Sequence, residues 1–122
     1  MKIFGHPWIE SETFYRVSSI DEIATTPPNS LLEIASLTSE TLPLLKYCHT
    51  EKLRYAVHIT TITEAIYAHN FGATLVLCEK ELAMVLMPIA QNYLFDTQVV
   101  AMAKEEEIEL LAKANVDGVK LN

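Results

Sequence analysis

Polar side chains that could bind a ligand stand after four apolar, strand-like runs of the sequence. Hydroxyl groups follow the first two runs at Thr38 and Thr60, and a carboxylate and an ammonium group follow the next two at Glu79 and Lys104. Ligands of open parallel sheets bind beyond the carboxyl ends of the strands, at the point where the strand order reverses. These four residues therefore predict a site for a small polar ligand that carries a phosphate or a carboxylate.

An enzyme at this edge would use Glu79 as acid or base and Lys104 as the anchor for an anion, with His58 or Cys48 assisting. However, the chain has no nucleophile elbow, Walker loop, HExxH motif or calcium-binding loop. Cys48 and His49 are neighbours on a predicted helix, where adjacent side chains point about 100° apart, so they form no catalytic dyad. We therefore predict no catalytic residues and keep the enzyme as the alternative.

The histidines and the acidic residues do not predict a metal site. Neither HxH nor HxxxH spacing relates the four histidines, which are His6, His49, His58 and His69. The acidic residues of 105–109 stand in the first turn of a predicted helix, where negative charge is favourable beside the positive end of the helix dipole. Consecutive helical side chains also diverge. We expect no metal and no other cofactor.

Short apolar runs alternate with helical patterns from residue 30 onward. Strands are predicted at 30–36, 54–60, 73–78, 98–103 and 118–121, and helices at 38–48, 61–71, 80–93 and 105–114. A weak repeat of 43 residues places Gly72 on Asn115, and these are the two residue types that most easily end a helix in the left-handed conformation. The pattern indicates an α/β fold: a small, three-layer open sheet, mostly parallel, built from Rossmann-like or flavodoxin-like βα units.

Local signals refine these elements. Thr61 and Glu64 have the spacing of a capping box, and Pro88 predicts a kink or break of its helix near Met84. The first 29 residues are less regular, with a possible strand at 13–17 and a short helix at 19–24. The opening segment has no periodicity and is expected to be an arm across the domain or onto a neighbour. We expect a single domain over 1–122, with 1–29 as an arm or extension and 30–122 as the βα units.

Composition restricts the partners. The 122 residues carry 16 acidic and 9 basic side chains, a net charge of −7, so phosphate backbones and anionic lipids would repel the chain. We therefore expect neither nucleic acid nor membrane as a partner. No secretion signal or membrane-spanning run is evident, so the cytoplasm is the expected location.

Self-association is the expected partnership. The predicted helix at 80–93 is apolar around more than one face, and a small open sheet often buries surplus apolar surface in a twofold dimer. The residues predicted for the interface are Leu82, Val85, Leu86 and Ile89.

The C-terminal part of the chain resembles a known family. The runs 73–78 and 98–103, followed by a helix with Glu-Leu-Leu and the turn Ala114-Asn-Val-Asp-Gly-Val119, resemble the second half of the Rossmann-type nucleotide-binding domain that regulates potassium conductance, of the Trk type. The same ending resembles a βα unit of a TIM barrel. The glycine-rich loop that holds a dinucleotide in that family is absent, since residues 36–41 read Ser-Leu-Thr-Ser-Glu-Thr, and none of its binding residues is carried over.

Three functional hypotheses follow. The favoured one is a non-catalytic, self-associating module with an interaction, regulatory or small-ligand-sensing role. The alternative is a small enzyme that acts on a phosphorylated or carboxylated metabolite at the carboxyl ends of the strands. The third is an incomplete nucleotide-binding regulator that takes its glycine loop from another chain.

Overall fold

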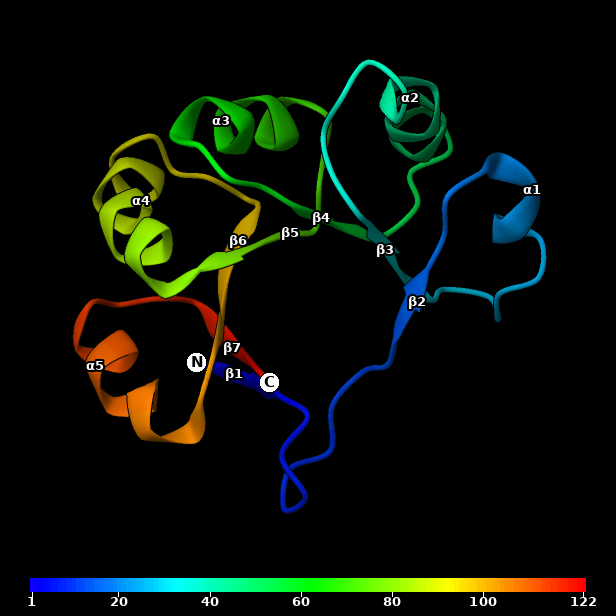
Figure 1. Ribbon diagram of the computed structural model, residues 1–122. Helices are drawn as coiled ribbons and strands as arrows, with labels where there is room; N and C mark the ends of the chain where they lie inside the picture. The colour runs from blue at the N-terminus through cyan, green and yellow to red at the C-terminus, as the bar shows by residue number, and fades with distance from the viewer.

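The computed structural model describes all 122 residues, which form seven parallel strands curled about a common axis with five α-helices around the outside (Figure 1). The strands are β1 (Lys2–Phe4), β2 (Phe14–Arg16), β3 (Leu31–Ile34), β4 (Tyr55–His58), β5 (Leu75–Glu79), β6 (Gln98–Ala103) and β7 (Gly118–Leu121). The helices are α1 (Ile20–Ile23), α2 (Leu42–Thr50), α3 (Ile62–Asn70), α4 (Lys80–Asn92) and α5 (Ile108–Lys113), with the 3₁₀ turn η1 (Glu105–Glu107) before α5. No helix has both the length and the apolarity required to cross a membrane.

The strand order runs in one direction around the curl. The order is β1-β7-β6-β5-β4-β3-β2, every pair is parallel, and each strand from β2 to β7 lies beside the next one in the chain. The predicted α/β class, with an open parallel sheet of βα units, is confirmed. Because the order never reverses, the fold lacks the reversal point that the sequence analysis invoked to locate a ligand.

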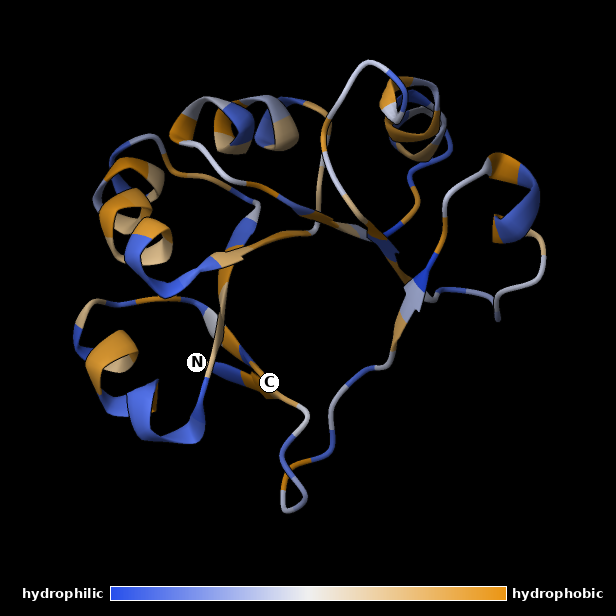
Figure 2. Cartoon of the chain, in the orientation of Figure 1, coloured by the Kyte–Doolittle hydropathy of each residue, from blue (hydrophilic) through white to orange (hydrophobic).

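The two faces of the sheet bury different sets of residues. The outer cluster of 24 buried residues combines strand and helix side chains, whereas the inner cluster contains strand residues alone. The inner cluster consists of Phe4, Leu31, Ala56, Leu75, Leu77 and Val100. Figure 2 shows hydrophilic and hydrophobic segments on each helix and largely hydrophobic central strands β5 and β6.

The sequence predicted helices on both faces of the sheet, in three layers. In the structure the helices lie on one face only. Right-handed crossovers that always move to the next strand in one direction place every helix on the same face. The sheet then curls until its inner face packs against itself. A three-layer sheet would require the strand order to reverse, which it does not do here.

The edges of the sheet are β1 and β2, which are not hydrogen-bonded to each other. Side chains bridge them instead: the rings of Phe4 and Phe14 meet edge to face with centroids 5.1 Å apart, and Lys120 Nζ lies 5.4 Å from the Phe14 centroid. β1 pairs with β7 at the other end of the chain (Figure 1), so the first residues form an edge strand of the sheet. Residues 5–13 connect β1 to β2 without a helix.

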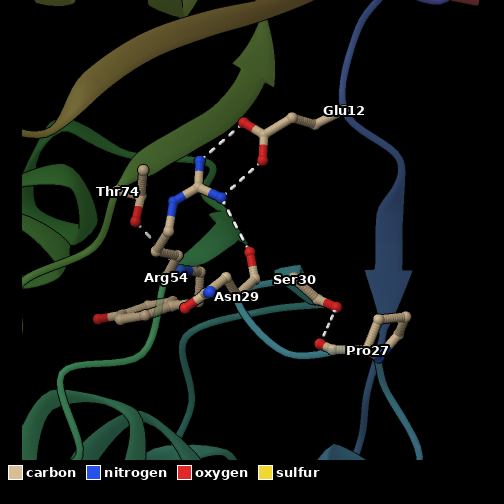
Figure 3. A network of polar contacts seen from close by, with 7 residues as sticks. Glu12, Pro27, Asn29, Ser30, Arg54 and Thr74 are labelled. Atoms are coloured by element: carbon tan, nitrogen blue, oxygen red, sulfur yellow. Dashed lines mark hydrogen bonds and ion pairs between the residues drawn. The ribbon is translucent and has the colours of Figure 1, made fainter.

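An ion pair fastens this connection at the amino end of the strands (Figure 3). Arg54, which precedes β4, donates from both terminal nitrogens to the Glu12 carboxylate over 2.6 and 2.7 Å, and also to the Asn29 carbonyl over 3.2 Å. The hydrogen bonding between Arg54 and Glu12, together with the positive charge of the guanidinium, lowers the pKa of Glu12. The approach to β2 is thereby held against the start of β4, two strands away.

Local signals in the sequence are largely confirmed. Thr61 caps α3 by accepting from the Glu64 N–H over 3.1 Å, while the Glu64 carboxylate accepts from Thr60 and not from Thr61. Gly72 and Asn115, which the 43-residue repeat aligns, both have positive φ, at 76° and 64°. The predicted break at Pro88 does not occur, because α4 is continuous from Lys80 to Asn92.

Replacement of Gly72 by alanine should destabilise the fold. At φ of +76° an added Cβ is strained, and it would also stand 3.0 Å from the His49 Nδ1 atom. We expect Gly72→Ala to lower the free energy of unfolding by about 1–2 kcal/mol in a urea titration. Asn115→Gly is the matched control and should change it by less than about 0.5 kcal/mol, because glycine adopts the same conformation freely. Equal effects of the two substitutions would contradict this account.

Candidate functional site

Ionisable side chains lie on the inner face of β2, β3 and β4, near the carboxyl end of each strand. Arg16, Glu33 and His58 each stand two positions beyond an inward-facing residue of β2, β3 or β4, and side chains two apart on a strand share a face. The strands are parallel, so the three residues lie together at the carboxyl end of the curl. This is the end at which parallel βα barrels hold their ligands.

Glu33 is the centre of this group. Its Oε2 atom accepts hydrogen bonds from Arg16 Nη2 over 3.2 Å and from His58 Nε2 over 2.5 Å. The side chains of Glu33, His58 and Arg16 are 10%, 22% and 57% exposed, so the cluster leads from the interior to the surface. Glu33 is the only charged residue among the 33 buried ones. We refer to Arg16, Glu33 and His58 as the mouth cluster.

The partners of Glu33 keep its carboxylate ionised. Burial by itself raises the pKa of Glu33, but the hydrogen bond from His58 and the positive charge of Arg16 together outweigh it, and the pKa is lowered from its ordinary value. At neutral pH the mouth cluster therefore contains a fixed negative charge that only these neighbours offset. Removing either partner would leave a buried charge with half its hydrogen bonds.

His58 has one committed and one free ring nitrogen. Its Nε2 atom is bound to Glu33, which places the ring proton there when the imidazole is neutral. Every buried side-chain nitrogen and oxygen in the protein has a hydrogen-bond partner, whereas His58 Nδ1 has none, so this atom must reach solvent. The Nδ1 lone pair of neutral His58 is thus available to a ligand.

Two cations flank Phe14 at the same end. Arg16 follows it on the inner face of β2, and Lys120 Nζ lies over its ring. Lys120 forms no ion pair, and Arg16 uses one of its five N–H donors on Glu33. With His58 neutral, Arg16, Lys120 and Glu33 sum to one positive charge in a chain whose net charge is −7. The surroundings of Phe14 can therefore accept a small anion.

The four ligand residues predicted from the sequence lie at this carboxyl end, but they do not contact one another. Thr38 and Thr60 are exposed and hydrogen-bond within their own βα connections. Glu79 begins α4 as its N-cap residue, and the Lys104 backbone N–H donates to the η1 carboxylate that caps it. Of the four side chains, those of Thr38 and Thr60 form hydrogen bonds within local connections.

The other sequence candidates occupy different places. Cys48 is fully buried, and burial raises its pKa to about 11, which removes it as an assistant in catalysis. Cys78 is also buried, as expected for a thiol in a central strand. No group of three or more His, Cys, Asp or Glu side chains is arranged to hold a metal ion.

The residues proposed for a dimer interface lie along α4 with unequal exposure. Leu86 is fully buried in the outer cluster, and Leu82 and Ile89 are partly buried against it. Val85 is 57% exposed and is the one residue of the four that presents most of its surface to solvent. Most of the apolar surface of α4 is therefore buried against the sheet of the same chain.

The sequence did contain a signal for the mouth cluster. Phe14-Tyr-Arg16, Leu31-Leu-Glu33 and Ala56-Val-His58 each place an apolar residue two positions before an ionisable one within a predicted strand. The candidates predicted from the sequence are the residues that follow the strands, whereas these three lie within them. A comparison of the residues within the strands would have aligned the three groups on one face.

No protein-family model matches this chain, and no curated protein is similar to it. The geometry of the mouth cluster is therefore the basis for assigning a function.

The contribution of Glu33 to stability should depend on pH. Its pKa is lower in the folded protein than the ordinary value of 4.5, so ionised Glu33 stabilises the fold above that pH, and this stability is lost as pH falls through the folded pKa. We expect Glu33→Gln to reduce the free energy of unfolding by ~1–3 kcal/mol at pH 7. The difference from the native protein should shrink steadily below pH 4.5.

Urea titrations of both proteins between pH 7 and pH 3 provide the measurement. Glu10→Gln is the control, since Glu10 is exposed and forms no ion pair, and it should leave the pH dependence unchanged. A Glu33→Gln deficit that stays constant across this range would contradict the assigned ionisation.

Proposed function

We propose that this protein is a ligand-binding module that takes a small anionic molecule at the mouth cluster. The observation that carries the proposal is Glu33, the only charged residue among the buried ones, bound to Arg16 and His58 where parallel βα strands end. The proposal agrees with the favoured sequence hypothesis of a small-ligand-sensing role.

The cost of burying the cluster argues against a purely structural role. Apolar side chains of similar volume commonly replace a buried ion pair with no loss of stability, and the rest of the inner face is apolar. Side chains that only filled the end of the curl would therefore not need to be ionisable. Their charge is useful to a molecule that binds there.

The donors define the class of ligand. Arg16 presents a planar fork of N–H groups that matches the oxygens of a carboxylate or a phosphate, and Lys120 adds a second positive charge beside Phe14. The Phe14 ring offers an apolar contact for the body of the ligand. A small metabolite with one carboxylate or phosphate satisfies these groups.

Ligand binding should depend on Arg16 and Lys120. Inorganic phosphate and pyruvate, added separately at low salt and neutral pH, should shift the backbone NMR signals of β2, β3 and β4. Arg16→Gln and Lys120→Gln should each weaken binding by about 10- to 100-fold, the equivalent of one charge-assisted hydrogen bond. A response to one anion and not to the other identifies the preferred headgroup.

Lys113→Gln is the matched control, because Lys113 is an exposed cation on α5 that pairs with Glu109. This variant should bind as the native protein does. Shifts that are absent for both anions, or that all three variants weaken equally, would overturn the proposed site.

We also propose that the protein self-associates through the outer surface of α3 and α4. Large apolar side chains are exposed along and directly after these consecutive helices, at Ile66, Tyr67, Val85, Tyr93 and Leu94. Exposed apolar side chains grouped on neighbouring elements are typical of interaction surfaces. A twofold dimer would cover the same surface on both copies.

A charge on this surface should prevent assembly. Native mass spectrometry of the native protein should show a dimer at micromolar concentration, and Val85→Glu should show a monomer, because burying an unpaired carboxylate opposes association. Lys46→Glu on the exposed side of α2 is the control and should leave the dimer intact. A native protein that is monomeric at these concentrations would disprove self-association.

A further inference from the structure

His58 is arranged as a general base, which anion binding alone does not require. We propose that the mouth cluster catalyses proton transfer at the carbon beside the carbonyl group of a small 2-oxo acid. The inference rests on the proposed function, because it uses Arg16 and Lys120 to bind the carboxylate of the same ligand.

The Glu33–His58 contact sets the direction of the proton transfer. Glu33 Oε2 lies 2.5 Å from His58 Nε2 and accepts a hydrogen bond from the Nε2–H group, so the neutral ring presents its lone pair at Nδ1. The only hydrogen bond of the His58 ring is at Nε2, and no buried side-chain nitrogen lacks a partner, so Nδ1 reaches solvent. When Nδ1 gains a proton, the imidazolium lies beside the ionised carboxylate of Glu33, which stabilises the new charge.

Positive charge is also in place for the negative charge that develops on the substrate. Arg16 is 57% exposed and retains free N–H donors, and Lys120 forms no ion pair. These cations bind the carboxylate of the substrate and stabilise the negative charge that develops on the enolate oxygen next to it.

The step is balanced within the substrate and His58. The C–H bond of carbon 3 breaks, its proton goes to His58 Nδ1, and its electron pair forms the C=C bond while the carbonyl electrons move onto oxygen. While it is on Nδ1 the proton exchanges with water. The proton that His58 then delivers to carbon 3 comes from solvent, and delivery to the enolate oxygen instead gives the enol. Neither route needs an oxidant, a reductant or a second substrate.

Solvent exchange of pyruvate tests this activity. In D₂O near neutral pH the pyruvate methyl signal in a proton NMR spectrum should decay faster with the protein than in buffer alone, and 2-oxobutanoate should lose its carbon-3 signal in the same way. His58→Gln should reduce the enzymatic rate by at least ~100-fold, because an amide cannot act as the base. The glutamine amide can still donate to Glu33, so this variant is expected to fold.

His69→Gln is the matched control, because His69 stacks on Phe95 with ring centroids 4.3 Å apart and lies outside the mouth cluster. It should exchange pyruvate at the native rate. Arg16→Gln should mainly raise the KM for pyruvate, whereas His58→Gln should mainly lower kcat.

Glu33 is a positioning residue in this scheme, since it acts through His58. Glu33→Gln should lower kcat by ~10-fold or more and change the KM by less than about threefold. A purely structural role would lower the melting temperature of Glu33→Gln and leave the kcat of its folded fraction unchanged. That result would remove Glu33 from the mechanism.

The outcomes separate this inference from the proposed function. Pyruvate that binds at β2–β4 without enhanced exchange overturns the proton-transfer activity and leaves anion binding standing. Exchange that His58→Gln retains also overturns the activity. Absence of both binding and exchange overturns both proposals.

Discussion

The curled sheet must fill its own interior, and the rest of the structure depends on how it does so. Every helix lies on the outer face, so the inner face has only the alternate side chains of its strands to bury. Six apolar residues occupy the middle, and the open side is spanned by the Phe4–Phe14 contact in place of a β1–β2 hydrogen-bond ladder. Polar groups are therefore restricted to the two ends of the curl, where water can reach them.

Charged side chains are paired differently at the two ends of the curled sheet. At the amino end, Arg54 and Glu12 satisfy each other through two short hydrogen bonds, and both side chains are about 40% exposed, at 39% and 42%. At the carboxyl end, a single carboxylate has two neighbouring groups that can bear positive charge, and Lys120 stands nearby without an ion pair. Arg54 and Glu12 thus satisfy each other, whereas Arg16 and Lys120 have donors left for a ligand.

Local features of the fold followed from the sequence, and long-range features did not. The bounds of β6 and β7 and the positive φ of Gly72 match the prediction, because each depends on residues close in the chain. β1 has only three residues and exists as a strand through its pairing with β7, more than a hundred positions away, which no local pattern reveals. The mouth cluster was missed for a related reason: Glu33 in an apolar run could face either side of the sheet until the direction of curl was known.

The position of Glu33 links the site to the edge of the sheet. Arg16 is its register partner across β2 and β3, and β2 has three residues and no neighbour on its other side. Edge strands of this length belong to the least stable part of a parallel sheet, because few hydrogen bonds hold them. A ligand held by Arg16 and by groups on β4 or β7 would join this edge to strands that have neighbours on both sides. Binding at the mouth cluster would therefore stabilise β2 against local opening, and the same charges that select the ligand would couple its presence to the order of the sheet edge.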